Sequence, residues 1–124
     1  MADVRVLVVD DQEPFRRAIA AVVSATDGFV LVASAPTGEA SLHVVARLRP
    51  DLVLMDVNLP GMDGLEATRR ITAVDDPPVV VLLSTYDQDE FDVTDAGAAA
   101  YLPKATFGPD LLAAAWAAAT SPHR

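Results

Sequence analysis

Short apolar runs alternate with helical patterns along the whole chain, and this alternation constrains the fold more than any other feature of the sequence. The apolar runs are Val4–Val9, Val30–Ala35, Leu52–Met55, Val79–Leu83 and Ala100–Leu102. The helical patterns that follow them cover Pro14–Ala25, Gly38–Leu48, Leu65–Val74, Glu90–Ala96 and Pro109–Ala119, and the fourth is the weakest. Strict alternation of strands and helices predicts an α/β fold, in which a parallel sheet carries helices on both faces.

Length and composition indicate one domain and argue against several classes of function. The 124 residues suit a single core, so we expect residues 1–120 to form one domain and residues 121–124 to be a tail or the start of a linker. The chain has no cysteine, which leaves no disulfide framework and no cysteine-based metal site. A net charge of −9 argues against direct binding of nucleic acid. Without a bilayer-spanning run or a signal pattern, we predict a cytoplasmic protein that does not enter a membrane.

Polar and charged residues stand where four of the predicted strands end. They are Asp10 and Asp11, Asp56, Ser84 and Thr85, and Lys104. In a doubly wound sheet, ligands bind outside the carboxyl ends of the strands, near the point where the strand order reverses. Carboxylates about 5 Å apart on neighbouring strands raise one another's pKa unless a cation lies among them. Lys104 supplies one positive charge, and Mg²⁺ with oxygen ligands is the natural second.

Each of these residues also has a simpler interpretation when it is taken alone. Asp11 is then best explained as a cap of the first helix, and Asp56 fits the start of a turn about as well as it fits a site. Ser84 and Thr85 carry almost no signal by themselves, while Lys104 is the only lysine of the chain. Acid, acid, hydroxyl and ammonium at successive strand ends are hard to assign to four separate caps. Together they favour a single site.

Four stretches make the chain resemble the receiver domain of two-component response regulators, the CheY-like family. They are VLVVDDQ (Val6–Gln12), DLVLMDVNLPGMDG (Asp51–Gly64), VVVLLST (Val79–Thr85) and AYLPK (Ala100–Lys104), and LSTYD (Leu83–Asp87) is similar to NarL/LuxR-type regulators. The resemblance implies a flavodoxin-like (βα)5 doubly wound sheet with strand order 2-1-3-4-5. It also implies a signalling domain that catalyses only its own phosphorylation and dephosphorylation, rather than an enzyme.

By this resemblance, Asp56 is the phosphoacceptor for a sensor histidine kinase or for a small donor such as acetyl phosphate. Asp11 would bind Mg²⁺ directly and Asp10 would bind it through water. Asn58 would offer the metal its backbone carbonyl. Phosphorylation would switch an output surface that meets an effector domain or a second copy of the chain, with regulation of transcription as the outcome.

The resemblance also implies a set of switching and tuning residues. Lys104 would pair first with Asp56 and then with a phosphoryl oxygen. Ser84 would move to hydrogen-bond the phosphate, and Tyr101 would turn inward as it does so. Access to the site and the lifetime of the phosphate would be modulated by Asn58, Thr85 and Tyr86.

The sequence departs from the family pattern in ways that matter for the site. Lys104 is preceded by Pro103 and followed by Ala105, which leaves the geometry of the Lys104–Ala105 peptide bond open. The segment Tyr86–Gly97 is short and contains Asp, Val and Thr, which form helices poorly, so we expect a short or irregular fourth helix. The alternative function is therefore a receiver-like module that acts through protein contacts without being phosphorylated.

Overall fold

The computed structural model describes residues 3–85 and 96–120, in which strands and helices alternate as the sequence predicts. The strands are β1 (Val4–Val9), β2 (Phe29–Ala35), β3 (Leu52–Asp56), β4 (Val79–Ser84) and β5 (Ala100–Pro103). The helices are α1 (Glu13–Ser24), α2 (Gly38–Leu48), α3 (Gly64–Thr72) and α5 (Pro109–Thr120), with a 3₁₀ turn η1 (Lys104–Thr106) after β5. All but the last residue of the predicted fourth helix, Glu90–Ala96, lies outside the described residues, so its irregularity stays a prediction.

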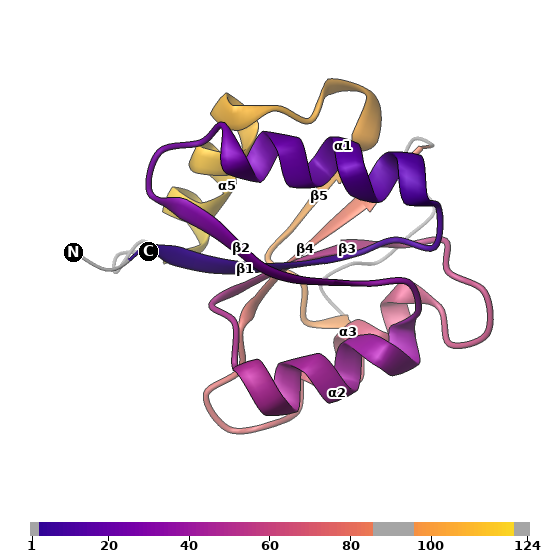
Figure 1. Ribbon diagram of the computed structural model, residues 1–124. Coiled ribbons are helices and arrows are strands. Elements are labelled where there is room, and N and C mark those ends of the chain that lie inside the picture. Colours follow the sequence, from indigo (N-terminus) through magenta and orange to yellow (C-terminus); the bar gives the residue numbers. More distant parts are fainter. Residues whose placement is uncertain (1–2, 86–95, 121–124) are drawn as a thin grey trace.

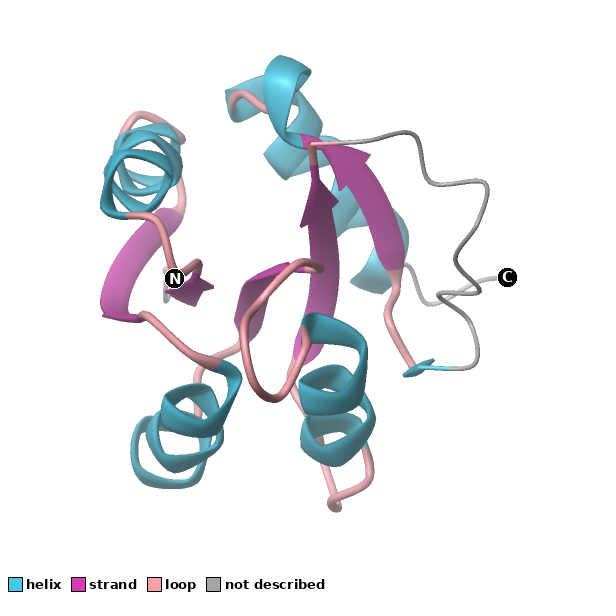
Figure 2. Cartoon of the chain, turned by 90° about the vertical axis from the view of Figure 1, so that its right-hand side faces the viewer, coloured by secondary structure: helices cyan, strands magenta, loops and turns pink. Residues whose placement is uncertain are grey.

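The strands form one parallel sheet in the order β2-β1-β3-β4-β5. Helices α1 and α5 cover one face and α2 and α3 cover the other (Figure 1). Figure 2 shows the same two pairs of helices on either side of the twisted sheet, viewed from a direction 90° away. This is the predicted doubly wound, flavodoxin-like arrangement. The strand order reverses between β1 and β3, so the carboxyl ends of these two strands flank the place where a ligand site is expected.

The two central strands are held by apolar contacts on both faces. Along β1, Val6 and Val8 pack in the cluster with α1 and α5, whereas Leu7 and Val9 pack in the cluster with α2 and α3. This follows from the period of two in a strand. All four side chains are fully buried, and each contributes about 1.5–3 kcal/mol on leaving water. Strand β3 is buried along its whole length, so its end is placed rigidly.

Strands β3 and β4 reach one residue further toward the carboxyl edge than the sequence predicts. Asp56 is the last residue of β3 and Ser84 is the last residue of β4. The cause is continued backbone pairing, because Asp56 lies opposite Leu83 in the register and the N–H of Val57 donates to the carbonyl of Leu83 at 3.0 Å. Both polar side chains therefore project from paired strands and not from a loop.

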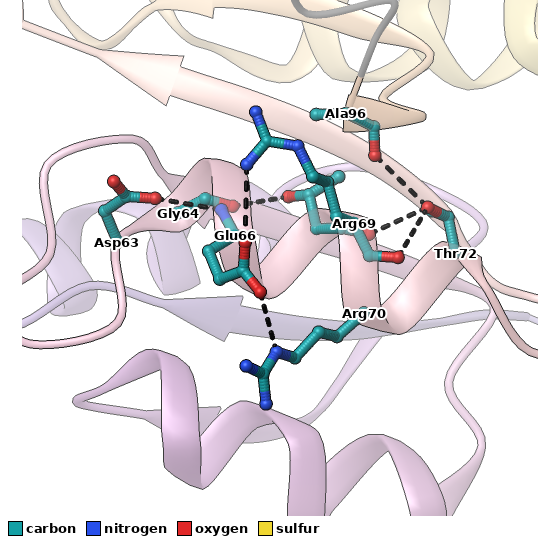
Figure 3. Close-up of polar contacts among 8 residues, drawn as sticks. Asp63, Gly64, Glu66, Arg69, Arg70, Thr72 and Ala96 are labelled. Carbon is teal, nitrogen blue, oxygen red and sulfur yellow. Dashed lines mark hydrogen bonds and ion pairs between the residues drawn. The ribbon is translucent and has the colours of Figure 1, made fainter.

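Helix α3 is tied down by side-chain hydrogen bonds at both of its ends (Figure 3). At its start, the Asp63 carboxylate accepts a hydrogen bond from the N–H of Glu66 at 2.8 Å and caps the helix. One turn on, Glu66 pairs with Arg70 at 2.8 Å, on the exposed surface. At its end, the Thr72 hydroxyl donates to the carbonyl of Ala96 at 3.2 Å. These contacts fix the helix that follows Asp56 and join it to the segment that leads into β5.

No helix within residues 3–85 and 96–120 is long and apolar enough to cross a membrane. Helix α1 packs on the sheet through one face, on which Ile19 and Val23 are buried while Phe15 and Val22 are half-buried. Trp116 of α5 meets the ring of Phe29 edge-on, with centroids 6.4 Å apart. This contact anchors the last helix against the outer strand β2.

Candidate functional site

The polar residues predicted from the strand ends converge at the carboxyl edge of the sheet. Asp10 follows β1, Asp56 ends β3 and Lys104 begins η1 directly after β5. A hollow of about 290 Å³ opens between these ends, and it is lined by Asp11, Gln12, Asp56, Asn58, Thr85 and Lys104. The parallel topology thus brings together side chains that are far apart in the chain, at the place that the sequence predicts.

Three carboxylates meet at this hollow. Asp10, Asp11 and Asp56 each place one oxygen within 4.8 Å of the other two. Asp10 is completely buried and Asp56 is 3% exposed, whereas Asp11 is exposed at the mouth. The N-cap of α1 is Gln12, which makes no side-chain capping bond. Asp11 is therefore not the helix cap that it resembles when it is taken alone.

Lys104 brings a positive charge into the acidic cluster. Its Nζ lies 2.6 Å from Asp10 Oδ2 and 3.3 Å from Asp56 Oδ2, and its side chain is only 6% exposed. Salt screens such buried pairs weakly, and removal of either partner would leave a buried charge without compensation. The Lys104–Ala105 peptide bond is trans, which answers the question that the sequence leaves open about this loop.

Backbone N–H groups hold the other oxygen of each buried carboxylate. The N–H of Asn58 donates to Asp56 Oδ1 at 3.0 Å, and the N–H of Gln12 donates to Asp10 Oδ1 at 2.9 Å. Both bonds reach two residues along the chain, a pattern that Asp favours where a strand ends in a turn. Asp56 therefore does stabilise a turn through Oδ1, as its simpler interpretation predicts, while its Oδ2 remains in contact with Lys104.

The charges of the cluster are not balanced by the groups that surround them. Burial raises the pKa of the Asp56 carboxyl above its ordinary value of 3.8, and the neighbouring charge of Asp10 raises it further. The N–H of Asn58 and the ammonium of Lys104 act in the opposite direction but do not cancel the rise. A cation that takes oxygen ligands fits this donor set, because carboxylates are the ligands that Mg²⁺ prefers.

Comparison with known proteins decides what this arrangement is. A family model for the response regulator receiver domain matches residues 6–116. The chain belongs to the response regulator receiver family. It is 42% identical over 103 residues to the response regulator GacA of Pseudomonas viridiflava, covering 82% of this chain and 48% of that protein. It is 39% identical over 103 residues to the transcriptional regulatory protein LiaR of Bacillus subtilis, covering 82% of this chain and 49% of LiaR. The chain spans about half the length of these curated relatives.

Solved structures agree with this assignment. The signal receiver domain of the response regulator NarL from Mycobacterium tuberculosis superposes with a TM-score of 0.88 at 28% identity, over 98% of this chain and 99% of that one. A LuxR-family response regulator from Aurantimonas sp. gives a TM-score of 0.86 at 28% identity, over 95% and 86% of the two chains. The chain is thus a receiver domain of two-component signalling, and its structural neighbours include NarL/LuxR-family regulators.

Of the residues predicted to switch the receiver or tune it, Asn58 and Thr85 line the hollow, and Ser84 directly precedes Thr85. Ser84 is buried at the end of β4. Tyr101 is half-buried in β5, opposite Leu82 in the register, and packs on the cluster between the sheet and helices α2 and α3. Thr85 lines the hollow, as expected for a residue at the entrance. Tyr86 lies outside the described residues, so its role stays a prediction.

Three further residues touch the site and were not assigned to it from the sequence. Gln12 lines the hollow. The ring of Phe15 has its centroid 4.3 Å from Lys104 Nζ. Gly64 lies so close to β3 that a Cβ there would overlap the carbonyl oxygen of Asp56. Only Gly64 carried a sequence signal, since a glycine at the start of a helix indicates a close backbone approach.

Proposed function

We propose that Asp56 accepts the phosphoryl group of a phosphohistidine in a sensor histidine kinase. One Asp56 oxygen would attack phosphorus as the bond from phosphorus to the imidazole nitrogen breaks, and the histidine would leave with that electron pair. This transfer needs an aligned nucleophile and positive charge around the phosphoryl oxygens. The observation that carries the proposal is the position of Asp56, at the base of the hollow with Oδ1 held by Asn58 and Oδ2 3.3 Å from Lys104.

We infer that Mg²⁺ is the cofactor of this receiver. Asp11 and Asp56, with the backbone carbonyl of Asn58, would hold the ion, and when bound it would neutralise charge on the phosphoryl oxygens. Asp10 is better suited to act through water, because its Oδ1 accepts from Gln12 and its Oδ2 meets Lys104 at 2.6 Å. The exposed carboxylate of Asp11 is the one that a hydrated ion reaches first.

Phosphorylation would act as a switch through the ends of β4 and β5. Lys104 would turn from Asp56 toward a phosphoryl oxygen, and the Ser84 hydroxyl would hydrogen-bond another. Tyr101 would follow, since it packs beside β4. Asn58 and Thr85 line the hollow and would modulate access and phosphate lifetime, and Tyr86 is proposed to do the same.

The consequence of switching is proposed by analogy with the relatives. Two of them are by name a response regulator and a transcriptional regulatory protein, and the chain spans about half of each. We therefore assign residues 1–120 to the receiver and residues 121–124 to a tail or linker. An effector domain or a second copy of the chain would read the switched surface and regulate transcription, with the receiver acting in the cytoplasm.

Intact-mass measurement tests the proposed phosphoacceptor directly. The receiver is incubated with acetyl phosphate and Mg²⁺, and a parallel sample contains EDTA. We expect one added phosphoryl group that requires Mg²⁺ and is absent from Asp56→Asn, whose amide has the same shape but cannot act as the nucleophile. An adduct of equal yield in Asp56→Asn would remove Asp56 from this role. No adduct from either acetyl phosphate or a histidine kinase would favour the phosphorylation-independent interaction module instead.

A further inference from the structure

The Lys104 ammonium has a third neighbour besides the two carboxylates. The centroid of the Phe15 ring lies 4.3 Å from Nζ, while Asp10 and Asp56 contact Nζ from their own strand ends. We propose that Phe15 is a positioning residue for Lys104. The face of its ring attracts the ammonium and holds it where it can stabilise a phosphoryl group on Asp56. This inference rests on the proposed function of Asp56.

The attraction is electrostatic and is favoured by burial. A cation within about 6 Å of an aromatic centroid is drawn to the negative face of the ring, and the energy increases when water is excluded. Lys104 meets both conditions, because its side chain is 6% exposed and its Nζ is well inside that distance. The ring has no hydrogen-bonding atom, so it does not compete with a phosphate for the ammonium's donors.

The fold holds the ring rigidly over the site. Phe15 lies in the first turn of α1, and the same helix is anchored to the sheet by Ile19 and Val23. Helical side chains lean toward the N-terminus of their helix, which directs the Phe15 ring back toward the strand end at Asp10. Arg16 ties this turn to β1, because its Nη1 donates to the Asp10 carbonyl at 2.7 Å.

The geometry also explains how Lys104 can change partners. In this structure Nζ lies closer to Asp10 Oδ2, at 2.6 Å, than to Asp56 Oδ2, at 3.3 Å. A phosphoryl oxygen on Asp56 would draw the ammonium away from Asp10. Movement across the ring of Phe15 breaks no hydrogen bond with it, so the ring can support the ammonium in both positions and exclude water from it throughout.

The contact can be tested without assigning a spectrum, because Lys104 is the only lysine of the chain. Protein labelled with ¹³C-lysine gives one set of side-chain NMR signals. We expect the protons on the Lys104 Cε to be shifted upfield by the ring current of Phe15. The shift should vanish in Phe15→Leu, survive in Phe15→Tyr and be unchanged in Phe29→Leu, whose ring faces Trp116 instead. An unshifted signal in the unmodified protein, or one unaffected by Phe15→Leu, would overturn the proposal.

Ring fluorination separates the electrostatic role from simple packing. Mono-, di- and trifluorinated phenylalanine at position 15 keeps the ring shape nearly constant while weakening its negative face. Phosphorylation by acetyl phosphate in excess Mg²⁺ should slow stepwise, by roughly twofold to thirtyfold over the series. The same series at Phe29 should leave the rate unchanged. A flat series at position 15 would overturn the proposal even if Phe15→Leu were slow, because only the shape of the ring would then matter.

A failure of the role proposed for Phe15 can be distinguished from a failure of the role proposed for Asp56. If the unmodified protein gains no phosphoryl group, the proposed role of Asp56 is wrong. The effect of the fluorinated series is then measured on the side-chain NMR signals of Lys104. A graded movement of these signals supports the attraction between the ring and the ammonium. No movement overturns it. Unfolding by urea for each variant confirms that the comparison is made between folded proteins.

Discussion

Lys104 Nζ lies 2.6 Å from Asp10 Oδ2, and both side chains are almost completely removed from water. The phosphoacceptor candidate, Asp56, has the longer contact with the same ammonium, at 3.3 Å. In the unmodified receiver, the single lysine is thus held mainly by an aspartate that is not the proposed phosphorylation site. The two aspartates should therefore respond differently to mutation.

Replacing Lys104 with Met should destabilise the receiver strongly. The variant keeps most of the side-chain volume but leaves the Asp10 charge buried without its cation, which costs about 3 kcal/mol of unfolding free energy. Urea denaturation at neutral pH without Mg²⁺ measures the loss. Adding Asp10→Asn to the variant should restore most of the stability, since the amide is uncharged. If the double variant were no more stable than Lys104→Met, the loss would come from packing of the lysine stem.

Replacing Asp56 with Asn should stabilise the metal-free receiver at neutral pH. Burial holds the folded-state pKa of Asp56 above 3.8, so the native state binds more protons than the unfolded state between the two pKa values. The stability associated with Asp56 is thus fully present below the unfolded pKa and is lost as the pH rises through the folded pKa. In EDTA, the unfolding free energy of the unmodified protein should fall relative to that of Asp56→Asn as the pH rises from about 4 toward neutral. A constant difference across that range would contradict the prediction.

Mg²⁺ should raise the melting temperature in a way that depends on Asp11. An ion that binds only the folded state adds about 2.7 kcal/mol when its concentration is one hundred times its dissociation constant. Asp11→Asn removes the exposed carboxylate at the mouth of the hollow and should abolish most of the shift. Asp27→Asn, at an exposed position outside the hollow, is the matched control. An equal Mg²⁺ response in Asp11→Asn and in the control would remove Asp11 from the metal site.

Gly64 should tolerate no side chain. A Cβ at this position would overlap the carbonyl oxygen of Asp56, which belongs to a buried strand and cannot retreat. We expect Gly64→Ser to lower the unfolding free energy by about 2 kcal/mol and to slow phosphorylation, because the strain falls on the proposed phosphoacceptor. Gly108→Ser places the same side chain where nothing lies within 4 Å and should be nearly neutral. Similar losses in both variants would show that the approach of α3 to Asp56 is not the cause.

Much of the fold could be predicted because it depends on local patterns. The nearly continuous apolar run of β1 and the helical spacing along α2 can be seen directly in the order of the residues, and both elements have the predicted bounds. The sequence predicts that β3 ends at Met55, one residue short of its end in the structure, because a charge normally ends an apolar run. Pairing of Asp56 with β4 overrides that local signal. Taken alone, Asp11 resembles a helix cap, but α1 begins after Gln12, and Asp11 lies in the acidic cluster that the strand ends together predict.

The sequence by itself determined the order of the elements, the parallel sheet and the charged residues at its carboxyl edge, because periodicity and strand ends are properties of neighbouring residues. Only the tertiary structure decided how these residues are paired. That Lys104 favours Asp10 over Asp56, that the Phe15 ring lies on the ammonium and that Gly64 touches Asp56 all depend on distances between separate segments. Those distances are set by the packing of α1, α3 and β5 around the central strands, to within fractions of an ångström, and no local pattern encodes them.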